Sequence, residues 1–245
     1  MILNVGHRGF GIYEIENTLS AFQRAIDFKL DMIECDVRLS KDDELIVFHD
    51  RSLKRMSSVG LRVEDLDLDT IKKFHIFNKK KNMEVSFERI PSLREVFELT
   101  NNKIHLNIEL KSNNKHKDLI LVKKVIELVK EYKATSQIII SSFKKDILKS
   151  IIEKNDEIRC GYIFHKKVKK KSLFHKAFPI YSIHPYKYLV GKKLIKLAKE
   201  HNIKIMPWTV NSNKLMKKLI LLKVDGIITN YPLKLSNVLL ANKII

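Results

Sequence analysis

Acidic residues alternate with apolar ones in two apolar segments of the sequence. Glu34 and Asp36 lie two residues apart in one segment, and Glu109 and Lys111 end the other. Because side chains of a strand alternate between its two faces, each pair would share a face. Buried neighbouring carboxylates repel each other unless a cation compensates them, and three carboxylate ligands without His or Cys favour Mg²⁺ or Ca²⁺ over zinc. The alternative is structural, with Lys or Arg side chains as the partners of these carboxylates.

Two histidines follow apolar segments at points where a loop begins. His7 comes soon after residues 2–5 and precedes Arg8, whose planar guanidinium suits phosphate oxygens. His49 follows residues 44–48. Histidine transfers protons near neutral pH, so both are candidates for acid–base chemistry. The alternatives are a surface His-Arg pair at the first site and a core or capping histidine at the second.

Four further residues bear on the predicted site. Lys111 lies nearer the end of its strand than Glu109 and is suited to hold a phosphate by charge. Trp208 follows a late apolar segment, where it would either form a wall of the pocket or belong to the core. Thr229 and Asn230 precede the last amphipathic stretch, so we expect them to cap a helix rather than to contact a substrate.

Eight strand-like segments recur along the chain, each followed by a helical or probable helical stretch. The segments are residues 2–5, 32–37, 104–110, 137–141, 159–164, 180–183, 204–208 and 226–229. Eight such units in 245 residues predict an α/β fold, a closed (β/α)8 TIM barrel, with catalytic groups at the C-terminal ends of its strands. A doubly wound open sheet is the alternative, because the pattern alone does not show closure. The basic stretch around Phe174 fits either a helix or a loop.

Two features interrupt this repeat. Residues 44–48 form an extra short strand in this interpretation, and residues 51–91 form a polar insertion at one mouth of the barrel. No Pro/Gly/Ser-rich linker divides the sequence, so we expect residues 1–245 to form a single domain. Asn17 is expected to cap the first helix.

The composition is that of a globular protein with a strong positive charge. The chain has 44% hydrophobic residues and a formal net charge of +19, which favours anionic substrates and allows weak association with an anionic membrane surface. Neither a signal peptide nor an apolar run long enough to cross a membrane is evident, so we expect a cytoplasmic protein. Cys35 and Cys160 match no zinc or redox spacing and are expected to be reduced core residues.

Taken together, these motifs resemble the glycerophosphodiester phosphodiesterase family in order and spacing. The stretches that carry the resemblance are residues 7–9, 16–22, 33–42, 47–50, 108–111, 208–211 and 225–232. They extend over essentially the whole chain. Two loop positions depart from the family pattern, Ile15 where Pro is usual and Asp43 where Gly is usual.

The resemblance implies a (β/α)8 barrel that hydrolyses a glycerophosphodiester to sn-glycerol 3-phosphate and an alcohol. It implies His7 and His49 as general acid and base, a divalent cation on the three carboxylates, and Arg8 and Lys111 on the phosphate. The partner would be this small-molecule substrate, with no nucleic acid expected. Two alternatives stay open: a lysophospholipase D that acts on lipids at a membrane surface, and a non-catalytic barrel that binds phosphodiesters or nucleic acid. The oligomeric state is unknown from the sequence.

Overall fold

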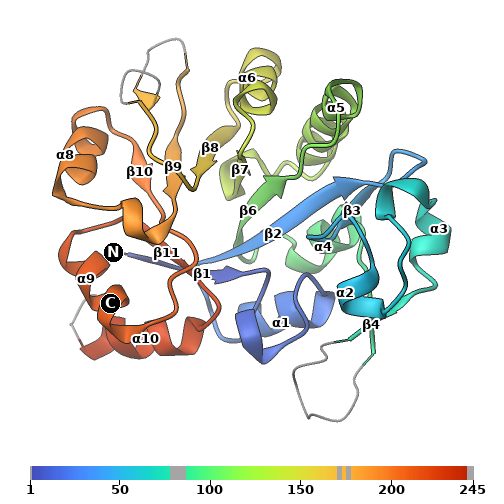
Figure 1. Ribbon diagram of the computed structural model, residues 1–245, viewed down its shortest axis with the longest axis horizontal. Coiled ribbons are helices and arrows are strands. Elements are labelled where there is room, and N and C mark those ends of the chain that lie inside the picture. Colours follow the sequence, from blue (N-terminus) through green and yellow to red (C-terminus); the bar gives the residue numbers. More distant parts are fainter. Residues whose placement is uncertain (1, 78–86, 170–172, 175–177, 242–245) are drawn as a thin grey trace.

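Eight parallel strands form a nearly closed barrel with helices around it (Figure 1). The computed structural model describes residues 2–77, 87–169, 173–174 and 178–241. The barrel strands are β1 (Leu3–His7), β2 (Met32–Leu39), β6 (His105–Leu110), β7 (Ile138–Ser142), β8 (Arg159–Phe164), β9 (Ser182–Pro185), β10 (Lys204–Ile205) and β11 (Gly226–Thr229). Their order in the sheet is β10-β9-β8-β7-β6-β2-β1-β11. The prediction of a (β/α)8 barrel is therefore confirmed.

Backbone hydrogen bonds close the barrel where the short strand β10 meets β11. The Asp225 amide donates to the Ile205 carbonyl at 3.0 Å. The Ile228 amide donates to the Pro207 carbonyl at 3.0 Å, and its own carbonyl accepts from the Val210 amide at 2.9 Å. These bonds exclude the open, doubly wound sheet. Strand β10 is shorter than the predicted segment 204–208, in which Pro207 has no amide hydrogen to donate to a ladder.

The outer layer consists of helices whose apolar faces pack on the barrel. The longer ones are α1 (Leu19–Asp27), α4 (Leu93–Thr100), α5 (Lys115–Glu131), α6 (Lys145–Lys154), α8 (Lys192–Glu200), α9 (Asn213–Leu221) and α10 (Pro232–Ala241), and the short 3₁₀ turns are η1 (Gly11–Tyr13), η3 (Thr135–Gln137) and η4 (Lys187–Leu189). Cys35 and Cys160 are buried free thiols, as expected. The stretch around Phe174 lies partly outside the described residues. Among the helices that the structure describes, none is both long and apolar enough to span a membrane.

The parallel register aligns the acidic residues of adjacent strands. Strand β1 pairs with β2 so that His7 lies opposite Glu34. Strand β2 pairs with β6 so that Glu34 lies opposite Asn107, and Asp36 lies opposite Glu109. Alternate residues of both strands, on the other face, belong to the apolar core beneath the helices. The sheet therefore directs these polar side chains to the barrel interior.

The segment after β2 forms a small unit beside the barrel mouth (Figure 1). It contains β3 (Leu45–Val47), which pairs antiparallel with β2, followed by α2 (Lys54–Ser57), η2 (Val63–Asp65), α3 (Leu68–Ile71) and the hairpin of β4 (His75–Ile76) and β5 (Glu88–Arg89). Its residues Ile46, Phe48, Leu53, Met56, Val63, Ile71, Ile76 and Ile90 form a separate apolar cluster, which Ile15 of the loop after β1 joins. Within the predicted insertion 51–91, residues 78–86 lie outside the described residues.

Candidate active site

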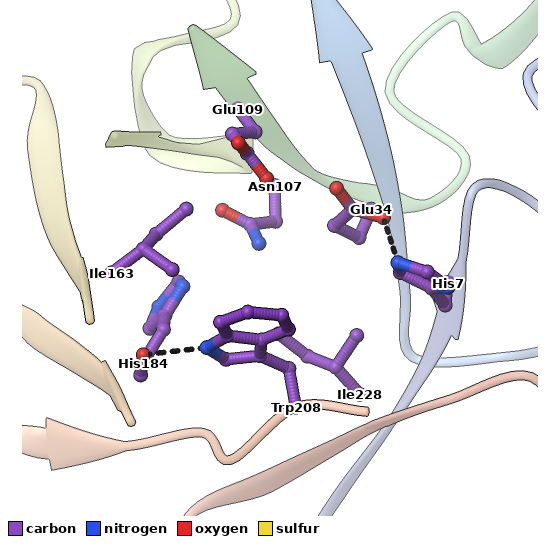
Figure 2. A pocket seen from close by; sticks show the side chains of 8 residues that line it. All are labelled: His7, Glu34, Asn107, Glu109, Ile163, His184, Trp208 and Ile228. Carbon is purple, nitrogen blue, oxygen red and sulfur yellow. Dashed lines mark hydrogen bonds and ion pairs between the residues drawn. The ribbon is translucent and has the colours of Figure 1, made fainter. Parts of the chain in front are cut away.

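Three buried carboxylates converge inside the C-terminal end of the barrel. Glu34 and Asp36 come from β2 and Glu109 comes from β6, and one oxygen of each lies within 4.8 Å of the other two. Figure 2 shows Glu34 and Glu109 beside one pocket. The structure thus brings together the three residues that strand parity places on one face. Their hard oxygen donors are those that Mg²⁺ and Ca²⁺ prefer.

Two cationic side chains partly compensate these carboxylates. Lys111 lies 2.9 Å from an Asp36 oxygen and also contacts Glu109, and the Arg8 Nε lies 3.3 Å from the other Asp36 oxygen. Although burial opposes it, the charges of Lys111 and Arg8 hold the pKa of Asp36 well below its usual range. Burial, reinforced by Asp36 and Glu109, raises the pKa of Glu34. Three carboxylates thus face two cationic side chains, and the donor set fits a divalent cation.

His7 presents one ring nitrogen to the pocket and uses the other for a hydrogen bond. Its Nδ1 donates to the Asn230 Oδ1 at 2.5 Å, and its Nε2 lies 3.8 Å from a Glu34 oxygen. Burial and the charge of Arg8 lower the pKa of His7 to about 4, so the ring is neutral near pH 7. The expectation that Asn230 caps the last helix is wrong, because its side chain turns toward β1. Thr229 does accept a backbone hydrogen bond at the start of α10.

The loop after β1 wraps Arg8 and Asn17 around the carboxylates. Arg8 has a left-handed backbone (φ 55°), its amide donates to a Glu34 oxygen at 2.9 Å, and its guanidinium donates to Glu16 at 2.7 Å. Asn17 donates to Asp36 Oδ2 at 2.9 Å and accepts from the Asp36 amide at 3.2 Å. The prediction that Asn17 caps α1 is wrong by one residue, since the cap is Thr18.

His49 lies two residues after the end of β3. Its Nδ1 lies 2.6 Å from the Asp50 Oδ1, so the carboxylate accepts the Nδ1 proton. The His49 carbonyl accepts two hydrogen bonds from the Arg38 guanidinium, at 2.9 and 2.7 Å. His49 is close enough to affect the electrostatics of Asp36 and Glu109. Both histidines are therefore fixed through Nδ1.

The pocket itself is small, with a cavity volume of about 20 Å³. The residues that line it include His7, Glu34, Glu109, Asn107, His184 and Trp208. Figure 2 shows the Trp208 indole across the pocket from the carboxylates, where its Nε1 donates to the His184 carbonyl at 2.9 Å. Trp208 thus forms a wall of the pocket. Asn107 Oδ1 and His184 Nδ1 are buried without a hydrogen-bond partner among the described residues.

Sequence reasoning missed several residues that hold the site in place. Asn230 and Asn17 were assigned to helix caps, and the role of Glu16 was not recognised apart from its place in a motif. For Asn230 the sequence signal was its position directly after a predicted strand, where barrel enzymes place functional groups. For Glu16 and Asn17 the signal was their place in the loop between the first predicted strand and the first helix. Asn230 and Asn17 pair with residues of distant strands, and Glu16 pairs with Arg8 and with Arg55 of α2. Spacing along the chain therefore did not identify these contacts.

Comparison with known proteins agrees with this geometry. The sequence pattern of the glycerophosphoryl diester phosphodiesterase family matches residues 7–234. A glycerophosphodiester phosphodiesterase of Caldanaerobacter subterraneus subsp. tengcongensis is 35% identical over 240 residues, which cover 96% of each chain. A lysophospholipase D of Mus musculus is 28% identical over 96% of this chain and 85% of its own length.

The fold is also that of a solved phosphodiesterase. The structure of an enzyme from Oleispira antarctica, in complex with the product sn-glycerol-3-phosphate, has a TM-score of 0.88 at 24% identity. The alignment covers 96% of this chain and 95% of that one. Because the family pattern matches nearly the whole chain, this protein is an enzyme that belongs to the glycerophosphoryl diester phosphodiesterase family.

Proposed function

We propose that the chain hydrolyses glycerophosphodiesters to sn-glycerol 3-phosphate and an alcohol, with a divalent cation and a pair of histidines. One observation carries the proposal: three buried carboxylates lie within reach of one ion beside His7 and Arg8 at the C-terminal end of the barrel. The relatives support the substrate class, since one is a glycerophosphodiester phosphodiesterase and a solved neighbour holds sn-glycerol-3-phosphate.

The carboxylates of Glu34, Asp36 and Glu109 would hold the cation, Mg²⁺ or Ca²⁺. When bound, the cation would supply positive charge against the phosphoryl oxygens of the substrate. Arg8 offers a fork of N–H donors to the same oxygens, and Lys111 adds an ammonium from the end of β6. Arg8 is held from both sides by Glu16 and Asp36, so its guanidinium is oriented before the substrate arrives.

His7 and His49 would carry out the proton transfers. One accepts the proton of the nucleophile and the other protonates the leaving alkoxide. Each donates its Nδ1 proton, to Asn230 or to Asp50, which leaves Nε2 for exchange with the substrate. This fixed tautomer is what a general base or acid at these positions requires.

Histidine variants test the proton-transfer roles. General acid–base catalysis contributes about 10²- to 10⁴-fold, so His7→Ala and His49→Ala should each lower kcat for glycerophosphoethanolamine at least about a hundredfold. His116 is an exposed histidine on α5, and His116→Ala serves as the control with unchanged turnover. Turnover within threefold of wild type in either site variant would refute the assignment.

Chelation tests the cation. Activity should disappear after dialysis against EDTA and return with Mg²⁺, Mn²⁺ or Ca²⁺, and the panel of ions identifies the one that works best. Release of glycerol 3-phosphate from glycerophosphocholine, -ethanolamine and -glycerol identifies the preferred alcohol. Full activity in metal-free buffer would contradict the three-carboxylate site.

A second candidate substrate class is a lysophospholipid, cleaved as by a lysophospholipase D. The observation that favours it is a row of aromatic rings that leads outward from the pocket. Trp208 contacts Phe143 and Tyr186 with ring centroids 5.5 and 5.8 Å away, and Tyr186 contacts Tyr188, which is 72% exposed. Such rings suit an acyl chain at a membrane surface. Faster hydrolysis of a lysophosphatidylethanolamine than of glycerophosphoethanolamine, with co-sedimentation on anionic liposomes, would favour this class.

A further inference from the structure

Arg55 projects from the unit beside the barrel toward the active-site loops. It lies in the short helix α2 between Leu53 and Met56, both buried in the apolar cluster of that unit. The amides of Met56 and Ser57 both donate to the Leu53 carbonyl, at 3.0 and 2.8 Å. The backbone that carries Arg55 is therefore anchored on both sides.

The Arg55 guanidinium contacts two carboxylates at once. Its NH1 and NH2 groups donate to the two oxygens of Glu16 at 3.0 and 2.6 Å, and its Nε donates to Asp50 at 2.5 Å. Glu16 belongs to the loop after β1, and Asp50 follows β3. The planar guanidinium has N–H donors on two edges and can bond both carboxylates at once, whereas the single ammonium of a lysine cannot reproduce this geometry.

Each of these carboxylates holds a residue of the proposed site. The Glu16 Oε1 that accepts from Arg55 also accepts from Arg8 at 2.7 Å. The other Asp50 oxygen lies 2.6 Å from the His49 Nδ1. Carboxylates thus alternate with nitrogen groups along one chain of contacts, from Arg8 through Glu16, Arg55 and Asp50 to His49.

We propose that Arg55 is a positioning residue that sets the placement of His49 relative to Arg8, although it does not touch the substrate itself. The inference rests on the proposed function, because it assigns Arg55 a task only if His49 transfers protons and Arg8 binds phosphate. It also gives the unit beside the barrel a part in catalysis. Through Arg55, this unit supports the phosphate-binding loop and the proton-transfer loop together.

A purely structural role for Arg55 is the competing explanation. The side chain is 46% exposed, and ion pairs at such positions contribute little to stability. The unit that carries Arg55 has an apolar cluster that does not depend on it. Loss of Arg55 should therefore change the geometry of the site more than the stability of the fold.

Arg55→Met tests the proposal, with Arg62→Met as the matched control. Arg62 lies in the same unit and pairs with Glu64, and it contacts neither Glu16 nor Asp50. We expect Arg55→Met to lower kcat about 10- to 100-fold, because small displacements of catalytic groups cost this much. KM should change less than threefold, because Asp36 still holds Arg8. Arg62→Met should keep wild-type kcat, and both variants should melt within about 2 °C of wild type. An Arg55→Met kcat within twofold of wild type, or a loss that Arg62→Met matches, would overturn the proposal.

A double-mutant cycle checks that Arg55 acts through Asp50. If it does, Arg55→Met combined with Asp50→Asn should lower kcat no more than about threefold beyond the more damaging single variant. Multiplicative losses would show that the two residues act independently and would overturn the proposal. The His49→Ala variant separates this inference from the function on which it rests. Inactive His49→Ala with fully active Arg55→Met refutes the inference alone, whereas active His49→Ala refutes the proposed function.

Discussion

Glu34 is the carboxylate of the cluster whose neutralisation should stabilise the metal-free protein but remove the stabilisation that a bound cation provides. It is 3% exposed, and among the described residues its side chain has no Lys or Arg partner within ion-pair distance. Burial and the charges of Asp36 and Glu109 raise its pKa above 4.5. Its ionisation therefore opposes folding, and the stability it provides when protonated is lost as the pH rises through the folded-state pKa.

The isosteric substitution Glu34→Gln removes this charge and one cation ligand together. A buried, poorly compensated carboxylate costs about 1–3 kcal/mol. A chain of 245 residues unfolds with an entropy of roughly 0.5 kcal/mol/K, so metal-free Glu34→Gln should melt about 2–6 °C above metal-free wild type at pH 8. The gain should vanish at pH 4, below the unfolded-state pKa.

The same substitution should abolish the rise in Tm that the cation causes in wild type. A cation at about 100 times its Kd stabilises wild type by about 2.7 kcal/mol, which is roughly 5 °C in Tm, and Glu34→Gln should show no rise at the same concentration. Scanning fluorimetry after EDTA dialysis measures both effects, and Glu127→Gln, at an exposed position of α5, is the control. A metal-free Tm at or below that of wild type, or an unchanged metal response, would refute the reasoning.

Three further variants test other parts of the site. Asn230→Ala removes the hydrogen bond that fixes His7, so kcat should fall about 10- to 100-fold in steady-state assays, and an unchanged kcat would contradict that role. Burial lowers the pKa of His184 from 6.5 to about 3, so its contribution to stability is lost as pH falls below 6.5. Between pH 6.5 and 4.5, wild type should lose about 2 kcal/mol more than His184→Gln in urea unfolding, and equal losses would refute this. A Cβ on Gly6 would lie 2.0 Å from the Gly9 carbonyl oxygen, so Gly6→Ala should destabilise by about 3 kcal/mol or more in the same assay, and wild-type stability would contradict the contact.

Strand periodicity predicted the carboxylates of the site, because the face on which a side chain lies depends only on its own strand. Glu34 and Asp36 share a face of β2 whichever strand lies beside it, and the apolar residues that alternate with them indicate a buried strand. The parallel register then brings Glu109 opposite Asp36. The repeat of strand and helix likewise predicted the barrel, but that repeat alone did not show that the sheet closes.

The residues that orient the site were not predictable in the same way. Asn230 has the side chain of a helix cap and stands before a helix, yet it bonds to His7 from 223 positions away. Asn17 stands one residue before the true cap and adopts a left-handed backbone (φ 57°) that turns it toward Asp36. Both outcomes depend on how distant strands meet in the closed barrel, which local preferences of a single segment do not encode.

The pairing of β1 with β11 has a consequence for the order in which activity appears during synthesis. Strand β1 is synthesised before the other barrel strands, but its neighbour on one edge, β11, is synthesised after all of them. Until β11 docks, that edge is open and His7 lacks Asn230, so a nascent chain with seven strands in place would hold an incomplete catalytic centre. Hydrolysis would then begin only when the first and last strands join, and the onset of activity in a translation time course would report completion of the barrel.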